Sequence, residues 1–233
     1  MKKRLIFCLF IIITCHVKGQ FAVSYSVGYG KYQMDDMHEL LNIVFWEVRS
    51  QLPEIPFAIT DHFPGYITHS MDLSYRYKKH EFGMRGSYLT TGGKISYADY
   101  SGEYAGKLIL NGYRMGLIYR FNQPVVTFNN GGGMSIWGEL SPGITFSKLK
   151  TDEFIRIFEE TQNQSEGLDA KANGFSLLPQ VGIKWNVLPF LGFYLGGGYD
   201  FLFGSTLKYQ GERSYLKADW SGLRINAGIS VSF

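Results

Sequence analysis

Cysteine is almost absent from the chain, and its placement excludes several kinds of chemistry. The 233 residues include only two cysteines, Cys8 and Cys15, and both lie near the N-terminus. If that segment is removed on export, the remaining chain has no cysteine. Disulfides, thiolate metal sites and cysteine nucleophiles are then excluded together.

The chain also lacks any apolar run of about 20 residues, the length that a membrane-spanning helix needs. The longest run, Leu5 to Thr14, follows a basic start and precedes a polar stretch that ends at Gly19. This order of regions is typical of a secretory signal peptide. We predict a signal peptide over residues 1–19, cleaved after Gly19, and one mature domain over residues 20–233.

A second interpretation of the leader stays open. Residues 12–15, Ile-Ile-Thr-Cys, loosely resemble a lipoprotein cleavage box in which Cys15 is lipidated, although threonine before the cysteine fits such a box poorly. The mass of the mature N-terminus would separate the two interpretations.

Charged residues are few, at 18%, whereas aromatic residues reach 16%. An average soluble domain has about 25% charged residues. Lys2, Lys3, Arg4 and Lys18 belong to the leader, and removing these four from 23 basic residues leaves 19 against 20 acidic ones. A mature chain so close to neutral has no electrostatic basis for binding nucleic acid.

Alternation of apolar with small or polar residues appears eight times, and this period of two predicts β-strands. Each run is long enough to cross a bilayer as a tilted strand, which takes about 9–11 residues. The predicted strands are Phe21 to Lys31, Tyr66 to Lys78, Glu81 to Thr91, Lys107 to Phe121, Met134 to Lys150, Asn173 to Val187, Leu191 to Ser205 and Leu223 to Phe233.

Charged residues within these runs predict what the two strand faces contact. Ten of them share the face opposite to the apolar one, and we expect none on the apolar face: Asp72, Arg76, Glu81, Arg85, Arg114, Arg120, Glu139, Lys184, Asp200 and Arg224. A basic side chain facing lipid at mid-bilayer costs about 2–4 kcal/mol. The apolar face is therefore predicted to face lipid, and the charged face to line a filled lumen, since about eight strands enclose only enough room for side chains.

Connection lengths give an independent indication of topology, because outer-membrane barrels alternate long outer loops with short inner turns. The predicted outer loops are Tyr32 to Gly65, Gly92 to Gly106, Thr151 to Ala172 and Thr206 to Ser221, and the inner turns are Lys79-His80, Asn122 to Gly133 and Leu188 to Phe190. Asn122 to Gly133 is the one long inner turn. Aromatic residues at both ends of the runs are placed as interfacial belts would be.

The C-terminal run from Gly222 to Phe233 ends on an aromatic residue after strict alternation. With the features above, the chain resembles the small outer-membrane β-barrel family, in a plan similar to the OmpA/OmpX-type, porin-like eight-stranded barrels. The resemblance implies an all-β, antiparallel up-and-down transmembrane β-barrel in the outer membrane of a Gram-negative cell envelope. It also implies contact with the lipid bilayer and lipopolysaccharide, assembly by machinery that reads the strand ending in Phe233, and a monomer.

The first outer loop contains the one predicted helix, from Asp35 to Arg49. Met37, Leu40, Leu41, Val44 and Val48 recur at helical spacing, and Asp35 or Asp36 could cap its start. The apolar stripe could dock a partner or lie in the outer leaflet. A lid packed over the barrel mouth is the interpretation we favour.

The other outer loops suggest weaker sites. Acidic residues in the third loop could hold divalent cations but lack EF-hand spacing, and they lie beside Arg156 and Lys171: Asp152, Glu153, Glu159, Glu160, Glu166 and Asp169. Aromatic residues in the second and fourth loops could stack on sugars or anchor the outer interface: Tyr97, Tyr100, Tyr104, Tyr209, Tyr215 and Trp220.

For catalysis the best candidate is the pair His69-Ser70, because some outer-membrane barrels of this size modify lipid A with a serine and a histidine. Adjacent strand residues point to opposite faces, so these two side chains cannot act together. His38, His62 and His80 lie singly without metal-ligand spacing. We therefore predict no catalytic, cofactor or metal residues and a non-enzymatic protein; a lipid A-modifying enzyme, a small pore and a secreted calycin-like binder stay as alternatives.

Overall fold

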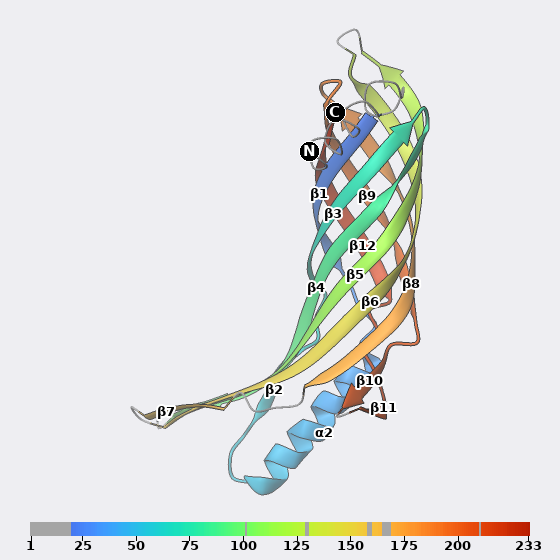
Figure 1. Ribbon diagram of the computed structural model, residues 1–233. Coiled ribbons are helices and arrows are strands. Elements are labelled where there is room, and N and C mark those ends of the chain that lie inside the picture. The colour runs from blue at the N-terminus through green and yellow to red at the C-terminus, as the bar shows by residue number, and fades with distance from the viewer. Residues whose placement is uncertain (1–19, 101, 129–130, 158–159, 165–168, 210) are drawn as a thin grey trace, which may run out of the picture.

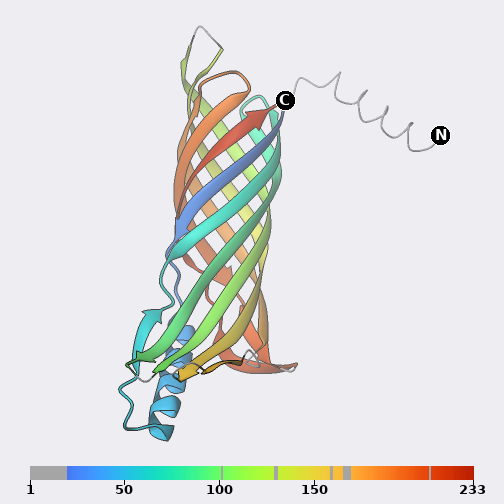
Figure 2. The same ribbon diagram turned by 90° about the vertical axis from the view of Figure 1, so that its left-hand side faces the viewer.

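The computed structural model describes residues 20–100, 102–128, 131–157, 160–164, 169–209 and 211–233. Eight antiparallel strands form a closed ring in which each strand pairs with the next (Figure 1, Figure 2). Around the ring they are β1 (Gln20–Gly30), β3 (Tyr66–Tyr77), β4 (His80–Ala98), β5 (Gly102–Thr127), β6 (Gly133–Ile157), β8 (Ala170–Asn186), β9 (Leu191–Phe203) and β12 (Gly222–Ser232). The predicted eight-stranded barrel is confirmed, and the predicted signal peptide lies outside the described residues.

The ring closes where the first strand meets the last. Val23 on β1 lies opposite Val231 on β12 and opposite Leu73 on β3. The backbone N–H of Phe233 donates to the carbonyl of Phe21 over 2.7 Å. The strand ends near Phe21 and Phe233 define what we call the inner end of the barrel, and the opposite end is the outer end.

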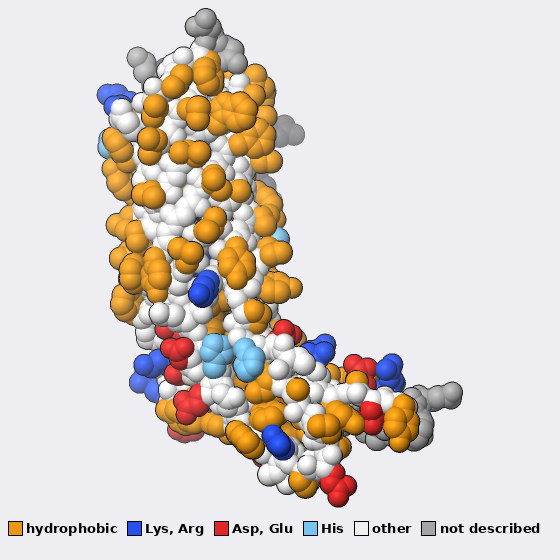
Figure 3. All heavy atoms as spheres, turned by 180° about the vertical axis from the view of Figure 1, so that it is seen from behind, with side chains coloured by type: hydrophobic (Ala, Val, Ile, Leu, Met, Phe, Trp, Pro, Cys, Tyr) orange, Lys and Arg blue, Asp and Glu red, His pale blue; other side chains and the backbone are white. Residues whose placement is uncertain are grey.

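Side chains alternate between the barrel wall and the lumen as predicted. On β5, Met115 and Leu117 are 67% and 61% exposed on the wall, whereas Arg114 beside them is 1% exposed in the lumen. On the face of the wall that Figure 3 shows, apolar side chains are spread along the whole barrel and far outnumber charged ones. Every backbone group of such a closed wall is paired between strands, and its surface is apolar, which is what a bilayer requires.

Three strands continue past the wall at the outer end, which corrects the predicted second outer loop. Most of Gly92 to Gly106 is not a loop, because β4 and β5 stay paired as far as Ala98 and Glu103. The turn between them is tight, and the N–H of Gly102 donates to Asp99 Oδ1 over 3.0 Å. Short strands in the other predicted outer loops add to this outer sheet: β2 (Ala58–His62), β7 (Glu160–Gln164), β10 (Thr206–Tyr209) and β11 (Glu212–Lys217).

A helix, α2 (Asp35–Gln51), covers the outer end of the lumen (Figure 1). Met37 and Leu41 on its inner face are fully buried and pack in one apolar cluster with Trp220. The predicted helix and its lid role are confirmed, but the predicted cap is wrong: Asp36 Oδ2 instead accepts the backbone N–H of Lys217 on β11 over 2.8 Å. Among the described residues, no helix is both long and apolar enough to cross a bilayer.

The long inner turn has a structural explanation. Strands β5 and β6 continue past the barrel as a two-stranded hairpin, with Thr127 still paired to Gly133. The inner turn between β3 and β4 is short, and Lys78 adopts a left-handed backbone there with φ of 56°. Short inner and long outer connections therefore alternate around the barrel except at two places, this extended inner hairpin and the tight outer turn between β4 and β5.

The prediction that no strand charge faces outward is wrong at the outer ends of β5 and β6. Lys107, Lys148 and Lys150 flank the buried residues Leu108 and Leu149, so they point away from the interior. A basic side chain costs only about 0–1 kcal/mol near the bilayer interface, which explains why these positions tolerate lysine.

Candidate functional site

The lumen is filled by a network of buried ion pairs centred on two arginines. Arg85 donates to both carboxylate oxygens of Asp72 over 2.7 Å and to Glu139 over 2.6 Å. Arg120 donates to Glu139 over 2.6 Å and to Glu81 over 2.9 Å. Four strands, β3 to β6, thus place their charges at one level of the lumen. Each charge is paired, as burial requires.

Aromatic side chains complete this level of the lumen. The guanidinium of Arg120 lies 5.0 Å from the ring centre of Trp137 and 5.8 Å from that of Tyr194. Gly182 and Gly196 leave room for the indole, because a Cβ at either position would overlap it. Trp137 was not predicted from the sequence to be a lumen residue. It lies two positions from Glu139 on the same strand, so the alternation places both side chains in the lumen.

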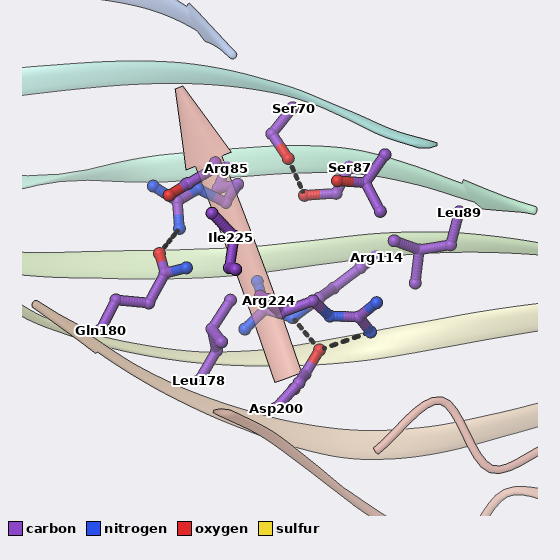
Figure 4. Close-up of a pocket in the computed structure, with 12 residues that line it drawn as sticks. Ser70, Arg85, Ser87, Leu89, Arg114, Leu178, Gln180, Asp200, Arg224 and Ile225 are labelled. Atoms are coloured by element: carbon purple, nitrogen blue, oxygen red, sulfur yellow. Dashed lines mark hydrogen bonds and ion pairs between the residues drawn. The ribbon is translucent and has the colours of Figure 1, made fainter. Parts of the chain in front are cut away.

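A second cluster lies nearer the outer end, around Asp200. Arg224 donates to Asp200 Oδ2 over 3.2 Å, and Arg114 Nε lies 3.9 Å from the same oxygen (Figure 4). Arg114 also donates to Ser176 Oγ over 2.7 Å. The Arg224 guanidinium lies 4.6 Å from the ring centre of Tyr32, where the lumen gives way to the apolar cluster below α2.

The space left between these groups is small. A cavity of about 30 Å³ is lined by residues of both clusters, among them Arg85, Ser87, Arg114 and Asp200 (Figure 4). A space of this size accommodates one or two water molecules. Arg224 Nη1 and Asp200 Oδ1 are both buried without a protein partner, so water is the natural ligand for this space.

The outer end is closed by packing of apolar side chains. Trp220, 1% exposed, donates from Nε1 to Ser147 Oγ over 2.9 Å, and its ring meets the edge of Tyr32 at 4.8 Å between centres. Phe57 packs against Tyr97 and Tyr104 in the sheet extension. We call α2 and the apolar cluster that contains Tyr32, Phe57 and Trp220 the outer plug.

The predicted aromatic positions in the outer loops divide between two environments. Trp220, Tyr97 and Tyr104 belong to the outer plug, so a role in stacking sugars or anchoring the interface is wrong for buried Trp220. Tyr100 and Tyr215 are strongly exposed. The pKa of Tyr104 is raised, first because burial disfavours the phenolate and then because Glu153 lies near.

The candidate catalytic pair is divided by the barrel wall, as the alternation predicts. His69 faces outward, with Nδ1 2.8 Å from the hydroxyl of Tyr25. Ser70 faces the lumen and donates to Ser87 Oγ over 2.9 Å. A lipid substrate on the wall would meet His69 but not Ser70.

The other histidines are less scattered than their spacing suggests. His38 on α2 and His62 on β2 lie with ring centres 6.4 Å apart, and His38 Nε2 is 2.8 Å from the carbonyl of His62. His80 contacts Tyr119 at the inner end. In the part of the chain that the structure describes, no three His, Cys, Asp or Glu side chains come together as a metal site.

The acidic third loop does not gather its carboxylates where the structure describes it. Asp169 forms an ion pair with Lys148 over 2.9 Å, and Arg156 forms one with Glu103 over 3.0 Å. Glu159 and Glu166 lie outside the described residues.

No protein-family model and no curated protein matches the chain. Solved structures do: Neisserial surface protein A, at 10% identity, covers 91% of this chain and 97% of its own with a TM-score of 0.45. The outer membrane protein OprG from Pseudomonas aeruginosa, at 10% identity, covers 92% and 96% with 0.45. Ail, the attachment invasion locus protein of Yersinia pestis, at 14% identity, covers 93% and 100% with 0.37. These are likenesses of overall architecture, and residue roles rest on this chain's own geometry.

Proposed function

We propose that the protein is an integral outer-membrane barrel with a closed lumen that acts at the cell surface through its outer plug and sheet extension. It is neither a pore nor an enzyme in this proposal. The observation that carries it is the filled lumen: Arg85, Arg120 and Trp137 occupy its middle, and Trp220 with α2 closes its outer end.

The barrel wall supports the membrane part of this proposal. Met71, Met84, Met115 and Val181 are all more than half exposed on the wall, an arrangement that would be unfavourable in water. A secreted calycin-like binder would instead turn this apolar face toward its own cavity. The proposed signal peptide over residues 1–19 would provide export to the membrane.

Assembly and oligomeric state are further parts of the proposal. The last strand presents Ile229, Val231 and Phe233 on the wall side, the pattern through which we propose that the barrel assembly machinery recognises the chain. Each barrel strand already has two neighbours, so a single copy forms a complete wall, and we propose a monomer.

Conductance tests the closed lumen directly. Purified protein that resists SDS until heated is inserted into planar lipid bilayers, and we expect no steady, water-filled conductance. The variant Arg114→Gly/Trp220→Gly/Arg224→Gly, which removes three large side chains at the cavity and the outer end, should also not conduct, because Arg85, Arg120 and Trp137 still occupy the middle of the lumen. A large steady conductance of the unchanged protein would disprove the closed lumen.

Extraction tests the location. We expect the protein to stay with the membrane fraction through high salt and osmotic shock and to leave it only with detergent. Release without detergent would contradict the membrane barrel and favour the secreted binder. Lipid A from cells with and without the protein should be identical, since an added or lost acyl chain would reveal an enzyme.

A further inference from the structure

Four basic side chains lie in one cross-strand row at the outer end of the barrel. Lys148 on β6 pairs in register with Lys171 on β8, Lys171 pairs with Lys208 on β10, and Lys208 pairs with Arg213 on β11. These strands lie side by side at the outer end (Figure 1). Because paired strands are about 4.8 Å apart, four positive charges fall within about 15 Å. We call these residues the basic row.

The basic row faces away from the interior. Lys148 lies between Ser147 and Leu149, which are buried, and Lys171 lies between Ala170 and Ala172, which belong to the outer plug. Lys208 follows buried Leu207 in the same way. Since successive strand residues point to opposite faces, the basic side chains point outward.

The row begins where the apolar wall ends. Phe146 is the outward residue two positions inward from Lys148, and Phe175 is four positions inward from Lys171. Phe175 stacks on Phe203 of β9 at 6.5 Å between ring centres. Girdles of aromatic residues flank the lipid-facing band of an outer-membrane barrel at both interfaces, so the basic row lies at or just beyond the outer interface.

The strand pattern marks the same boundary. On β6, Phe146 faces outward and Ser147 inward, but at the next pair Lys148 faces outward and Leu149 inward. The apolar residues thus change from the outer to the inner face within four residues. A wall surrounded by lipid ends where this inversion occurs.

Like charges directly opposite one another on neighbouring strands destabilise a sheet, so the row needs anions nearby. Among the described residues, Lys148 is the only member with an ion pair, to Asp169, which is half exposed. The hydrogen bond from Lys148, with the charges of Lys171 and Lys150, lowers the pKa of the Asp169 carboxyl. One carboxylate leaves most of the positive charge unneutralised.

We infer that the basic row binds the phosphate groups of a phosphorylated glycolipid of the lipid A type in the outer leaflet. The inference rests on the proposed membrane placement, which surrounds the wall with lipid. Lysine binds phosphate as a point charge and arginine as a planar fork of donors, so three lysines and Arg213 at headgroup level complement a headgroup that carries two phosphates. The neighbouring aromatic and aliphatic wall would contact the acyl chains of the same lipid.

The test uses full-length mature protein in detergent, with bound lipid counted by native mass spectrometry. The probes are bisphosphorylated lipid A, the same lipid with both phosphates removed, and phosphatidylglycerol. The variant Lys171→Gln/Lys208→Gln removes half of the row without breaking a described ion pair. The control Lys78→Gln/Lys79→Gln removes two lysines at the inner end.

We expect bisphosphorylated lipid A to bind the unchanged protein in preference to both other lipids. A lysine near an anionic lipid surface contributes about fivefold in affinity, so the row variant should bind about 25-fold more weakly and the control within about twofold of the unchanged protein. If the double variant fails to fold, Lys208→Gln alone should weaken binding about fivefold.

Equal binding of phosphorylated and phosphate-free lipid A would overturn the inference, as would equal losses in the row variant and the control, or equally tight binding of phosphatidylglycerol. The same preparations are tested for conductance and for heat-dependent mobility. A folded, non-conducting barrel without lipid A binding would refute only the lipid site. A conducting barrel would refute the proposed closed lumen, whatever the lipid result.

Discussion

Replacing Glu139 by glutamine tests whether the buried ion pairs hold the barrel together. The Glu139 carboxylate is fully buried and accepts hydrogen bonds from both arginines at the centre of the lumen: over 2.6 Å from Arg85 to Oε1, and over 2.6 and 2.9 Å from Arg120 to Oε2. An amide of the same size turns one acceptor into a donor that faces a guanidinium. It also removes a negative charge from a lumen where basic residues already outnumber acidic ones.

The expected loss of stability follows from burial. Removing one partner of a buried ion pair costs about 3–5 kcal/mol, because the other charge stays in a medium of low dielectric constant. Asp72 and Glu81 still pair with the arginines. The loss in the free energy of unfolding for Glu139→Gln should therefore be about 3 kcal/mol, the lower end of this range. We would measure the free energy of unfolding in lipid vesicles by guanidinium titration with tryptophan fluorescence.

Glu103→Gln is the matched control. Glu103 also forms an ion pair with an arginine, Arg156, over 3.0 Å, but both side chains are at least one third exposed. Solvent screens such a pair, so the loss should be at most about 1 kcal/mol. If Glu139→Gln costs no more than Glu103→Gln, the lumen is hydrated enough to screen its charges, and the reasoning for a dry, filled lumen fails.

Three further predictions address the wall, the outer plug and assembly. Met115→Lys places a charge on the lipid-facing wall and should reduce the free energy of unfolding by about 2–4 kcal/mol, whereas Tyr215→Lys on exposed β11 should change it by less than about 0.5 kcal/mol. Trp220→Ala should cost about 3–5 kcal/mol and speed amide hydrogen exchange in α2; unchanged exchange would mean that the helix does not depend on the indole. Phe233→Ala, at a position 77% exposed, should lower the amount of folded protein in cells while the refolded protein keeps its stability within about 0.5 kcal/mol, and normal assembly in cells would contradict a role as a recognition signal.

The barrel could be predicted from the sequence because strand alternation reflects a local rule. Along Phe175 to Trp185, odd positions are apolar and face lipid whatever the neighbouring strand contains. The inward position of Trp137 could also be predicted from the sequence, because it lies two residues from Glu139 and therefore on the same face of the strand. A large aromatic side chain would be expected on the lipid-facing side, and the glycines across the lumen, Gly182 and Gly196, explain how the indole fits inside.

The sheet extension could not be predicted in the same way. Gly92 and Gly93 follow two threonines, a composition typical of a loop, and the strand continues through them because of tertiary contacts. A Cβ at Gly93 would lie 2.8 Å from side-chain atoms of Leu41 on α2 and of Phe63. The small residue therefore lets the helix approach the sheet, a requirement that no local pattern records.

The change of strand pattern at the outer end explains how one chain forms two interiors of opposite character. Within the wall the surroundings are apolar, so outward residues such as Met115 are apolar and inward ones such as Arg114 are polar. Beyond the wall the surroundings are water, and inward Leu110 and Leu108 form an apolar core while Lys107 faces outward. A strand that kept one pattern throughout would bury charge in the plug or expose leucine to water. The position where the pattern inverts therefore marks the membrane boundary in the sequence itself. On β6 it falls between Phe146 and Lys148, so the basic row begins where the lipid surface ends.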